Sequence, residues 1–263
     1  MTKVGIIGVG NMGEALLAGL LRDGTPTSDV VFAQRSDARA EYISQTYGIL
    51  RKPLAEVAGC EVVIVAVKPK DISSICEEIK SHLRSDGVIV SVAAGKTIQG
   101  IQDIVGVDKA VIRVMPNTPS FIGKGAAGLS LGAGVSAAQF NFVKKIFEAN
   151  GIVVEVPESL QAAITATSGS GPAYFFAFAE AMIDGAKKLG LDENVATELV
   201  IQTIVGAAGM LASSEKSATE LRENVTSPNG TTFAALTKFY EMGLGQMVES
   251  AMEASAKRSQ ELA

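Results

Sequence analysis

Tryptophan is absent from this chain and aromatic residues make up only 5% of it, so no stacking platform for single-stranded nucleic acid is expected. No basic block stands out and the formal net charge is −5, which argues against nucleic acid or a membrane surface as the main partner. The longest apolar stretch, 199–212, contains Gln202 and Thr203 and is too short to span a bilayer. The first residues lack the pattern of a signal peptide. These absences favour a cytoplasmic protein with a small-molecule substrate.

Cysteine and histidine are also scarce. The two cysteines, Cys60 and Cys76, match no metal-ligand spacing, so we expect free buried thiols in a reducing cytosol and no metal site. The only histidine, His82, falls at the end of a predicted helix, where a structural or solvated role is expected. Dehydrogenases that use a histidine base on a hydroxy acid are therefore disfavoured.

The first half of the chain alternates short β-branched runs with helical segments. Strands are predicted at 4–7, 30–33, 62–67, 88–92, 111–114, 127–131 and 152–156, with helices between them that include 71–82 and 136–150. The run 62–67 is apolar throughout, as in a strand buried on both faces of a parallel sheet. The pattern predicts an α/β fold with a doubly wound, Rossmann-type sheet, which holds ligands at the carboxyl ends of its strands.

The second half of the chain contains only helical patterns. Helices are predicted at 158–167, 172–189, 193–213, 218–224, 231–240 and 244–262. Helix 193–213 is apolar on nearly every face in its second half, and such a helix is usually buried all round. Because so short a helical half can hardly bury this helix alone, we expect a second chain to cover it. The predicted domains are 1–157, which binds the nucleotide, and 158–263, an all-helical substrate and dimerisation domain.

The most informative motif follows the first predicted strand. Residues 4–7 lead directly into Gly8-Val9-Gly10-Asn11-Met12-Gly13, after which an apolar helical stretch begins. The order of strand, glycines and helix turns a weak G-x-G-x-x-G match into a dinucleotide-binding fingerprint. The unpaired N–H groups of the helix start would face the phosphates of the ligand. The alternative is an ordinary strand–turn–helix unit whose glycines serve packing.

The tip of the second predicted strand indicates which dinucleotide is bound. In NAD-binding sheets, an Asp or Glu at this tip accepts a hydrogen bond from the ribose 2′-hydroxyl. Here Arg35 and Ser36 stand at the tip, and they suit a 2′-phosphate through guanidinium pairing and a hydroxyl donor. Asp37 is interpreted as a cap or first-turn residue of the next helix. The pattern favours NADPH over NADH, which stays possible; the alternative is that Arg35 is a solvated surface arginine.

A strong base for hydroxyacid chemistry is missing. Lysine-based hydroxyacid dehydrogenases place a lysine shortly after a Gly-x-Gly turn, but the comparable segment here has Tyr174 and Phe175. Lys187 and Lys188 lie about three helical turns further on, too far to substitute. Reduction without a strong protein base suits a carbon–nitrogen double bond, because a protonated imine is already electrophilic.

Three further segments have the composition of site loops. Residues 66–69 (Ala-Val-Lys-Pro) end a buried strand where a cofactor would lie, and residues 115–119 end another. Residues 224–232 break one helix and open the next, and they offer N–H groups and hydroxyls to an anion. Plain helix capping by Ser227 or Thr231 explains the same residues equally well.

In these segments the chain resembles pyrroline-5-carboxylate reductase, the enzyme family that makes proline. The resemblance covers essentially the full length and rests on six segments in the family's order, 8–13, 66–69, 91–95, 113–119, 168–174 and 224–232. It implies a nucleotide-binding sheet domain followed by a helical domain that interlocks with a partner into a homodimer, often assembled further, as in a ring of dimers. It also implies NADPH-dependent reduction of the imine of 1-pyrroline-5-carboxylate to L-proline.

The resemblance implies roles for individual residues. It places Ala66, Val67, Lys68, Pro69, Ala93, Ala94 and Asn224 at the nucleotide. They join the residues that the motifs themselves predict to bind it, which are Gly8, Gly10, Asn11, Met12, Gly13, Arg35, Ser36 and, in the loop 115–119, Asn117. The substrate carboxylate would be held by Ser227, Gly230, Thr231 and Thr232. Thr232 would also be the hydrogen-bond partner of the ring nitrogen, and Glu158 would lie near the substrate. Asn229 departs from the glycine usual in this loop, but Asn tolerates a left-handed φ, so the loop shape is expected to survive.

Two other functions stay open from the residues alone. One is a reductase that acts on a different cyclic imino acid, such as a six-membered ring. The other is a non-catalytic NADP-binding module that senses the nucleotide. The intact 224–232 segment favours an enzyme, because a sensor has no need for a second anion site.

Overall fold

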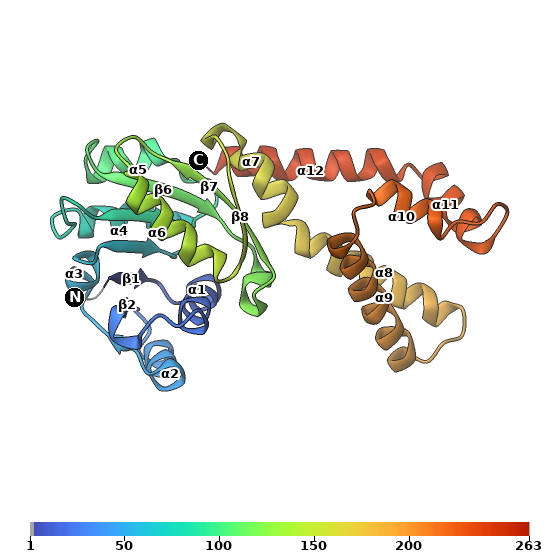
Figure 1. Cartoon of the computed structure of the whole chain (residues 1–263), viewed down its shortest axis with the longest axis horizontal. Coiled ribbons are helices and arrows are strands. Elements are labelled where there is room, and N and C mark those ends of the chain that lie inside the picture. The colour runs from blue at the N-terminus through green and yellow to red at the C-terminus, as the bar shows by residue number, and fades with distance from the viewer. Residues whose placement is uncertain (1–2, 263) are drawn as a thin grey trace. The chain divides into compact units, whose positions relative to one another are not determined.

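The computed structural model describes residues 3–262, which form two compact units. The sheet unit comprises the chain up to Pro172 together with the residues from Glu253 onward, and the helical unit comprises Ala173–Met252 (Figure 1). Residues 158–172 thus pack with the sheet, whereas the division of functions between 1–157 and 158–263 stays a prediction.

An eight-stranded sheet forms the centre of the sheet unit, in the order β3-β2-β1-β4-β5-β6-β7-β8. Strands β1 to β6 are parallel, whereas β7 runs antiparallel to β6 and β8 runs parallel to β7. The chain order reverses between the neighbours β1 and β4, which is the point where open α/β sheets bind ligands. The strands are β1 (Val4–Ile7), β2 (Val30–Ala33), β3 (Leu50–Arg51), β4 (Val62–Val65), β5 (Val88–Ser91), β6 (Ala110–Met115), β7 (Gly125–Leu131) and β8 (Gly151–Glu155).

Helices cover both faces of the sheet, as its apolar strands require. One core contains side chains of α1, α2 and α6, such as Leu16 and Phe147, and the other contains side chains of α3, α4 and α5, such as Val57 and Ile79. The doubly wound sheet predicted from the sequence is therefore confirmed. The helices of this unit are α1 (Asn11–Arg22), α2 (Asp37–Tyr47), α3 (Leu54–Ala58), α4 (Ile72–Ile79), α5 (Ile98–Val105), α6 (Ala137–Glu148) and α7 (Gln161–Ile164).

The predicted strands agree with the observed ones at most of their residues, and the differences have local causes. The sequence did not predict β3, because two residues carry no periodic signal. The helix predicted at 71–82 begins as a 3-10 turn, Pro69–Asp71, and its α-helical part ends at Ile79. The helix predicted at 158–167 is broken into a 3-10 turn, α7 and a π-helical turn, Thr165–Gly169. The Thr165 hydroxyl donates to the Gln161 carbonyl oxygen at 2.8 Å, and such back-bonding perturbs helices.

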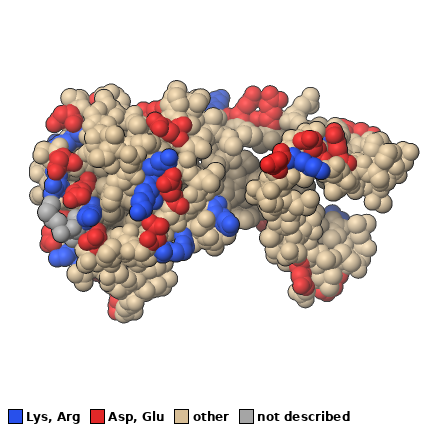
Figure 2. Space-filling model, viewed as in Figure 1, with Lys and Arg blue, Asp and Glu red and all other residues tan. Residues whose placement is uncertain are grey.

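The helical unit exposes most of its apolar side chains. It contains α8 (Gly171–Lys188) from Ala173 onward, α9 (Glu193–Ser213), α10 (Ala218–Asn224), α11 (Thr231–Glu241) and α12 (Leu244–Glu261) up to Met252. On α9 only Ala196 and Val200 are buried within the single chain. This agrees with the expectation that one chain cannot bury the helix alone, whereas its cover by a second chain stays a prediction. On the face shown in Figure 2, acidic and basic side chains are distributed over the sheet unit, whereas uncharged residues, drawn in tan, make up most of the helical unit.

Helix α9 extends beyond the apolar stretch 199–212 at both ends. Its apolar stretch was expected to be too short for a bilayer, but the whole helix has 21 residues and is long and apolar enough to span one. This finding rests on length and composition alone, and a helix that packs against protein passes the same test.

Candidate functional site

The turn after β1 has the backbone geometry of a diphosphate cradle. Gly8 has a left-handed φ of +87°, and a Cβ there would lie 2.8 Å from Val67 Cγ1. A Cβ on Gly13 would lie 2.2 Å from the Gly8 carbonyl oxygen, so α1 begins in direct contact with the turn. In contrast, a Cβ on Gly10 would meet nothing within 4 Å. The turn therefore excludes side chains where it packs and leaves space where a ligand would approach.

Helix α1 offers unused donors at this space. Gly10 is its N-cap residue and makes no side-chain capping hydrogen bond. The first helical hydrogen bond runs from the Glu14 N–H to the Gly10 carbonyl oxygen at 2.9 Å. The N–H groups at 11–13 precede this bond and lie at the positive end of the helix dipole, where an anion is favoured. The cradle thus fits a dinucleotide diphosphate.

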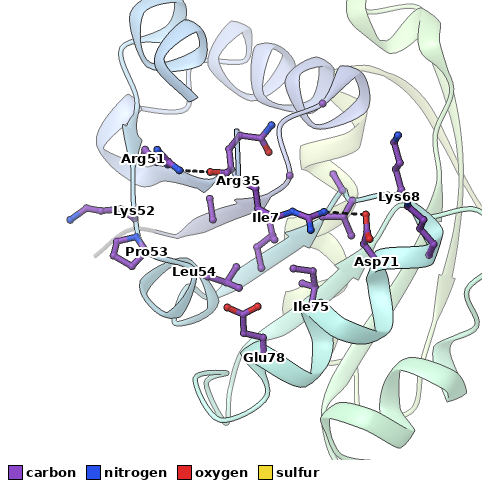
Figure 3. Close-up of a pocket in the computed structure, with 17 residues that line it drawn as sticks. Ile7, Arg35, Arg51, Lys52, Pro53, Leu54, Lys68, Asp71, Ile75 and Glu78 are labelled. Atoms are coloured by element: carbon purple, nitrogen blue, oxygen red, sulfur yellow. Dashed lines mark hydrogen bonds and ion pairs between the residues drawn. The ribbon is translucent and has the colours of Figure 1, made fainter. Parts of the chain in front are cut away.

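A cleft of about 920 Å³ opens beside the cradle, at the carboxyl ends of β1, β2 and β4 (Figure 3). This volume lies within the usual range for small-molecule sites. The apolar side chains of Ile7, Leu54 and Ile75 line it, which suits an adenine ring. Its charged lining has more cations than anions, and comprises Arg35, Arg51, Lys52, Lys68, Lys70, Asp71 and Glu78. Such a lining suits a phosphorylated ligand.

Two arginines, Arg35 and Arg51, lie at the edge of this cleft. Arg35 reaches across it toward α4, where its guanidinium lies 3.2 Å from Asp71 Oδ2 (Figure 3). Because the Arg35 side chain is 79% exposed, this pair is weak and a 2′-phosphate can replace Asp71 as its partner. Arg51 donates to the Gln34 carbonyl oxygen at 2.7 Å and to Asp37 Oδ1 at 2.6 Å, which fixes the turn between β2 and α2.

The same turn settles which residue caps α2. Ser36 is the N-cap residue, and its Oγ accepts from the Arg39 backbone N–H at 3.4 Å. Asp37 stands in the first turn, as one of the two sequence interpretations had it. Because the Ser36 hydroxyl accepts in this cap, its own proton remains available to a phosphate oxygen.

Glu158 is engaged inside the sheet unit. Its Oε1 accepts from the Ile98 backbone N–H at 2.7 Å and from the Arg113 guanidinium at 3.1 Å. The carboxylate thereby joins the start of α5 to β6. The segment that it fixes follows Ala93 and Ala94, which were predicted to line the nucleotide.

Asn117 likewise has protein partners for both ends of its amide. Its Nδ2 donates to the Ser168 carbonyl oxygen at 3.0 Å, and its Oδ1 accepts from the Ala126 backbone N–H at 2.9 Å. The amide therefore ties the loop after β6 to β7 and to the π-helical turn. A role for Asn117 toward the cofactor stays a prediction.

The helical unit contains the second predicted anion site, in the loop between α10 and α11. Asn229 adopts the left-handed φ of 58° that was expected of it. Gly230 is the N-cap residue of α11 and no side chain caps this helix, so the interpretation of Ser227 or Thr231 as its cap is wrong. A Cβ on Gly230 would lie 2.4 Å from Ser227 Oγ, which explains the glycine. Thr231 and Thr232 open α11, so their N–H groups stand at its positive end.

The predicted cofactor residues divide according to their positions. Those that line the cleft are Gly8, Gly10, Arg35, Ala66, Val67 and Lys68. Pro69 starts the 3-10 turn after β4, and Asn224 ends α10 in the helical unit. Sequence reasoning missed Arg51, Lys52 and Asp71 as lining residues. Two adjacent cations before Pro53 were the only signal for Arg51 and Lys52, and such a pair is common on surfaces.

The cysteines and the histidine lie apart from this chemistry. Cys60 and Cys76 are free and buried, as predicted, and burial raises the pKa of each thiol to about 11. His82 is exposed. Among residues 3–262, no group of three or more His, Cys, Asp or Glu side chains is arranged to hold a metal ion.

Known proteins match this chain over its whole length. Residues 158–262 match the family described as pyrroline-5-carboxylate reductase dimerisation, and residues 3–95 match NADP oxidoreductase, coenzyme F420-dependent. The pyrroline-5-carboxylate reductase of Mycobacterium leprae is 39% identical over 100% of this chain and 97% of its own length. A pyrroline-5-carboxylate reductase structure from Coxiella burnetii has a TM-score of 0.93 at 34% identity and covers 100% of this chain and 98% of its own. The Plasmodium falciparum pyrroline carboxylate reductase, solved with NADP bound, has a TM-score of 0.90 at 30% identity. The match covers 99% of this chain and 98% of that one.

Proposed function

This chain belongs to the pyrroline-5-carboxylate reductase family, and we propose that it reduces the imine of 1-pyrroline-5-carboxylate to L-proline with NADPH, the last step of proline biosynthesis. The observation that carries the proposal is the presence of two anion sites of different kinds in one chain. A glycine-rich turn with a cationic cleft suits a dinucleotide, and the open start of α11 suits a small carboxylate.

Residues of the sheet unit would hold the cofactor. The N–H groups at 11–13 would receive the diphosphate, and Arg35 with Ser36 would bind the 2′-phosphate that distinguishes NADPH from NADH. Residues 66–69 and 93–94 follow β4 and β5, where the rest of the dinucleotide would lie. When bound, the reduced nicotinamide supplies a hydride to the imine carbon.

Residues of the helical unit would hold the substrate. The substrate carboxylate would accept hydrogen bonds from Ser227, Gly230 and Thr231 at the positive end of α11. The Thr232 hydroxyl would donate to the ring nitrogen, which gains a lone pair as hydride adds to the protonated imine. These residues therefore act by orienting the two reactants, and a strong protein base is not required.

We also infer that the working protein is a cytoplasmic homodimer, assembled further into a ring of dimers. Large apolar side chains of the helical unit, such as Phe175, Phe176 and Val205, are more than half exposed within one chain. A soluble monomer rarely exposes so much apolar surface, and a second copy of the same unit would cover it symmetrically. The matched dimerisation family over residues 158–262 supports the same inference.

The proposed reaction is tested by following NADPH absorbance with the purified full-length protein. We expect oxidation that depends on 1-pyrroline-5-carboxylate and yields an equal amount of L-proline. A higher kcat/KM for a six-membered cyclic imino acid would assign the chain to a different reductase. Tight NADPH binding with no oxidation in the presence of either ring would instead indicate a sensor module.

A further inference from the structure

Glu14 places a negative charge in the first turn of α1, the helix whose start forms the proposed diphosphate site. The residue is only 8% exposed. Two side chains of α2 engage its carboxylate: the Tyr47 hydroxyl donates to Oε1 at 3.0 Å, and the Arg39 guanidinium pairs with Oε2. An acidic side chain at this position stabilises the helix, but it also repels any other anion that binds at the same end.

Arg39 connects this carboxylate to the glycine-rich turn. Its Nε donates to the Val9 carbonyl oxygen at 2.8 Å, between the two glycines that shape the turn. Its guanidinium also lies 5.1 Å from the centre of the Tyr42 ring, and this contact restricts its orientation. A single side chain of α2 thus fixes the turn and neutralises the first turn of α1.

Because Arg39 and Glu14 are largely buried, the net charge of the pair affects anion binding at the start of α1. The side chains of Arg39 and Glu14 are 28% and 10% exposed, so solvent and salt screen their charges less than those of a surface pair. Tyr47 supplies a hydrogen bond but no positive charge. Burial and the hydrogen bond to Glu14 raise the pKa of Tyr47 to about 12, so the phenol stays protonated near neutral pH. Without Arg39, an unpaired carboxylate would therefore remain beside the donors that receive the diphosphate.

We propose that Arg39 is a positioning residue for the dinucleotide, which neutralises Glu14 and holds the Val9 carbonyl so that the turn and α1 can accept the cofactor's diphosphate. The proposal rests on the proposed dinucleotide site. It differs from the role given to Arg35, because the diphosphate is common to NADPH and NADH. Loss of Arg39 weakens the binding of both nucleotides equally, whereas loss of Arg35 weakens that of NADPH alone.

The test compares the Kd values of NADPH and NADH, measured by calorimetry with the full-length protein, for two single variants and their combination. Arg39→Met is expected to raise both Kd values about tenfold, because it leaves the Glu14 charge unpaired. Glu14→Gln keeps an acceptor for Tyr47 and removes the repelling charge, so it lowers both Kd values about threefold. The double variant returns to within about threefold of the wild type, since the unpaired charge is gone. Arg84→Met is the matched control, because Arg84 pairs with Asp86 away from the cleft, and it leaves both Kd values unchanged.

The opposite signs of the two single variants separate this proposal from a purely structural one. If Glu14→Gln and Arg39→Met both weaken nucleotide binding, or if both only lower the melting temperature, the pair has a purely structural role and the proposal is wrong. If these variants change the affinity for NADPH but not that for NADH, the pair acts on the 2′-phosphate and not on the diphosphate, and the proposal is also wrong. If Arg39→Met does not fold, the sign of the Glu14→Gln effect decides by itself. Failure of the wild-type protein to bind either nucleotide would reject the proposed function instead.

Discussion

Replacement of Glu158 by alanine removes a carboxylate that has two partners inside the sheet unit. The Arg113 side chain is only 8% exposed, so in the variant its guanidinium remains buried without its partner. Breaking a buried pair in this way costs about 3–5 kcal/mol, and we take the lower end because Glu158 itself is 30% exposed. The Ile98 N–H at the start of α5 also loses its acceptor, and this loss lowers the free energy of unfolding by about 1 kcal/mol more. The expected loss of unfolding free energy is therefore about 3–4 kcal/mol.

Thermal unfolding and steady-state kinetics on the same preparation measure this prediction. A loss of this size lowers the Tm of a chain of this length by about 6–16 °C. Glu158→Gln keeps an oxygen acceptor for both donors and is expected to lose only about 1–2 kcal/mol. The control is Glu155→Gln, which changes an exposed acid of β8 and leaves the Tm unchanged. An unchanged Tm with a raised KM for the imino acid would refute the structural reasoning and favour the substrate contact that the family resemblance implies.

Four further predictions address the cofactor, the assembly, the reaction and the thiols. Arg35→Ala raises the KM for NADPH about tenfold or more and leaves that for NADH unchanged, and equal losses for both would show that Arg35 does not bind the 2′-phosphate. Ala208→Glu on the exposed face of α9 yields a monomer by sedimentation or abolishes folding, whereas an unchanged dimer would place the interface elsewhere. Thr232→Ala lowers kcat about tenfold to a thousandfold with Tm intact, and the reverse result would remove Thr232 from the mechanism. Cys60 and Cys76 stay unmodified by a thiol reagent at about pH 8 until the protein unfolds. Because burial raises each thiol pKa from 9.0 to about 11, their contribution to stability is full below pH 9.0 and falls as pH rises from there to about 11.

The sequence predicted most of the sheet unit, because its signals are local. The conformation is determined locally in the apolar runs of β1, β4 and β5 and in the glycines at 8–13. The role of Arg35 at the tip of β2 could likewise be predicted without knowledge of the residues on the other side of the cleft. The start of α11 was recognised for the same reason, although its capping residue was not.

The remaining features depend on contacts between residues far apart in the chain. Glu158 meets Arg113, and Arg39 meets Val9, across separations of 45 and 30 residues that no periodic pattern records. The short strand β3 brings Arg51 to the cleft only through its pairing with β2. The exposure of α9 within one chain was expected, because the helical half is too short to bury an apolar helix alone, but composition does not indicate which residues of a second chain would cover it.

The measurement that tests the proposed reaction most directly is hydride tracing with NADPH deuterated at nicotinamide C4, on the stereochemical face that the enzyme uses. The purified protein is incubated with this cofactor and 1-pyrroline-5-carboxylate, and the product is analysed by mass spectrometry and NMR. The account predicts L-proline with one deuterium at the carbon of the former imine. Unlabelled proline when each face has been deuterated in turn, or oxidation of NADPH without proline, would contradict it.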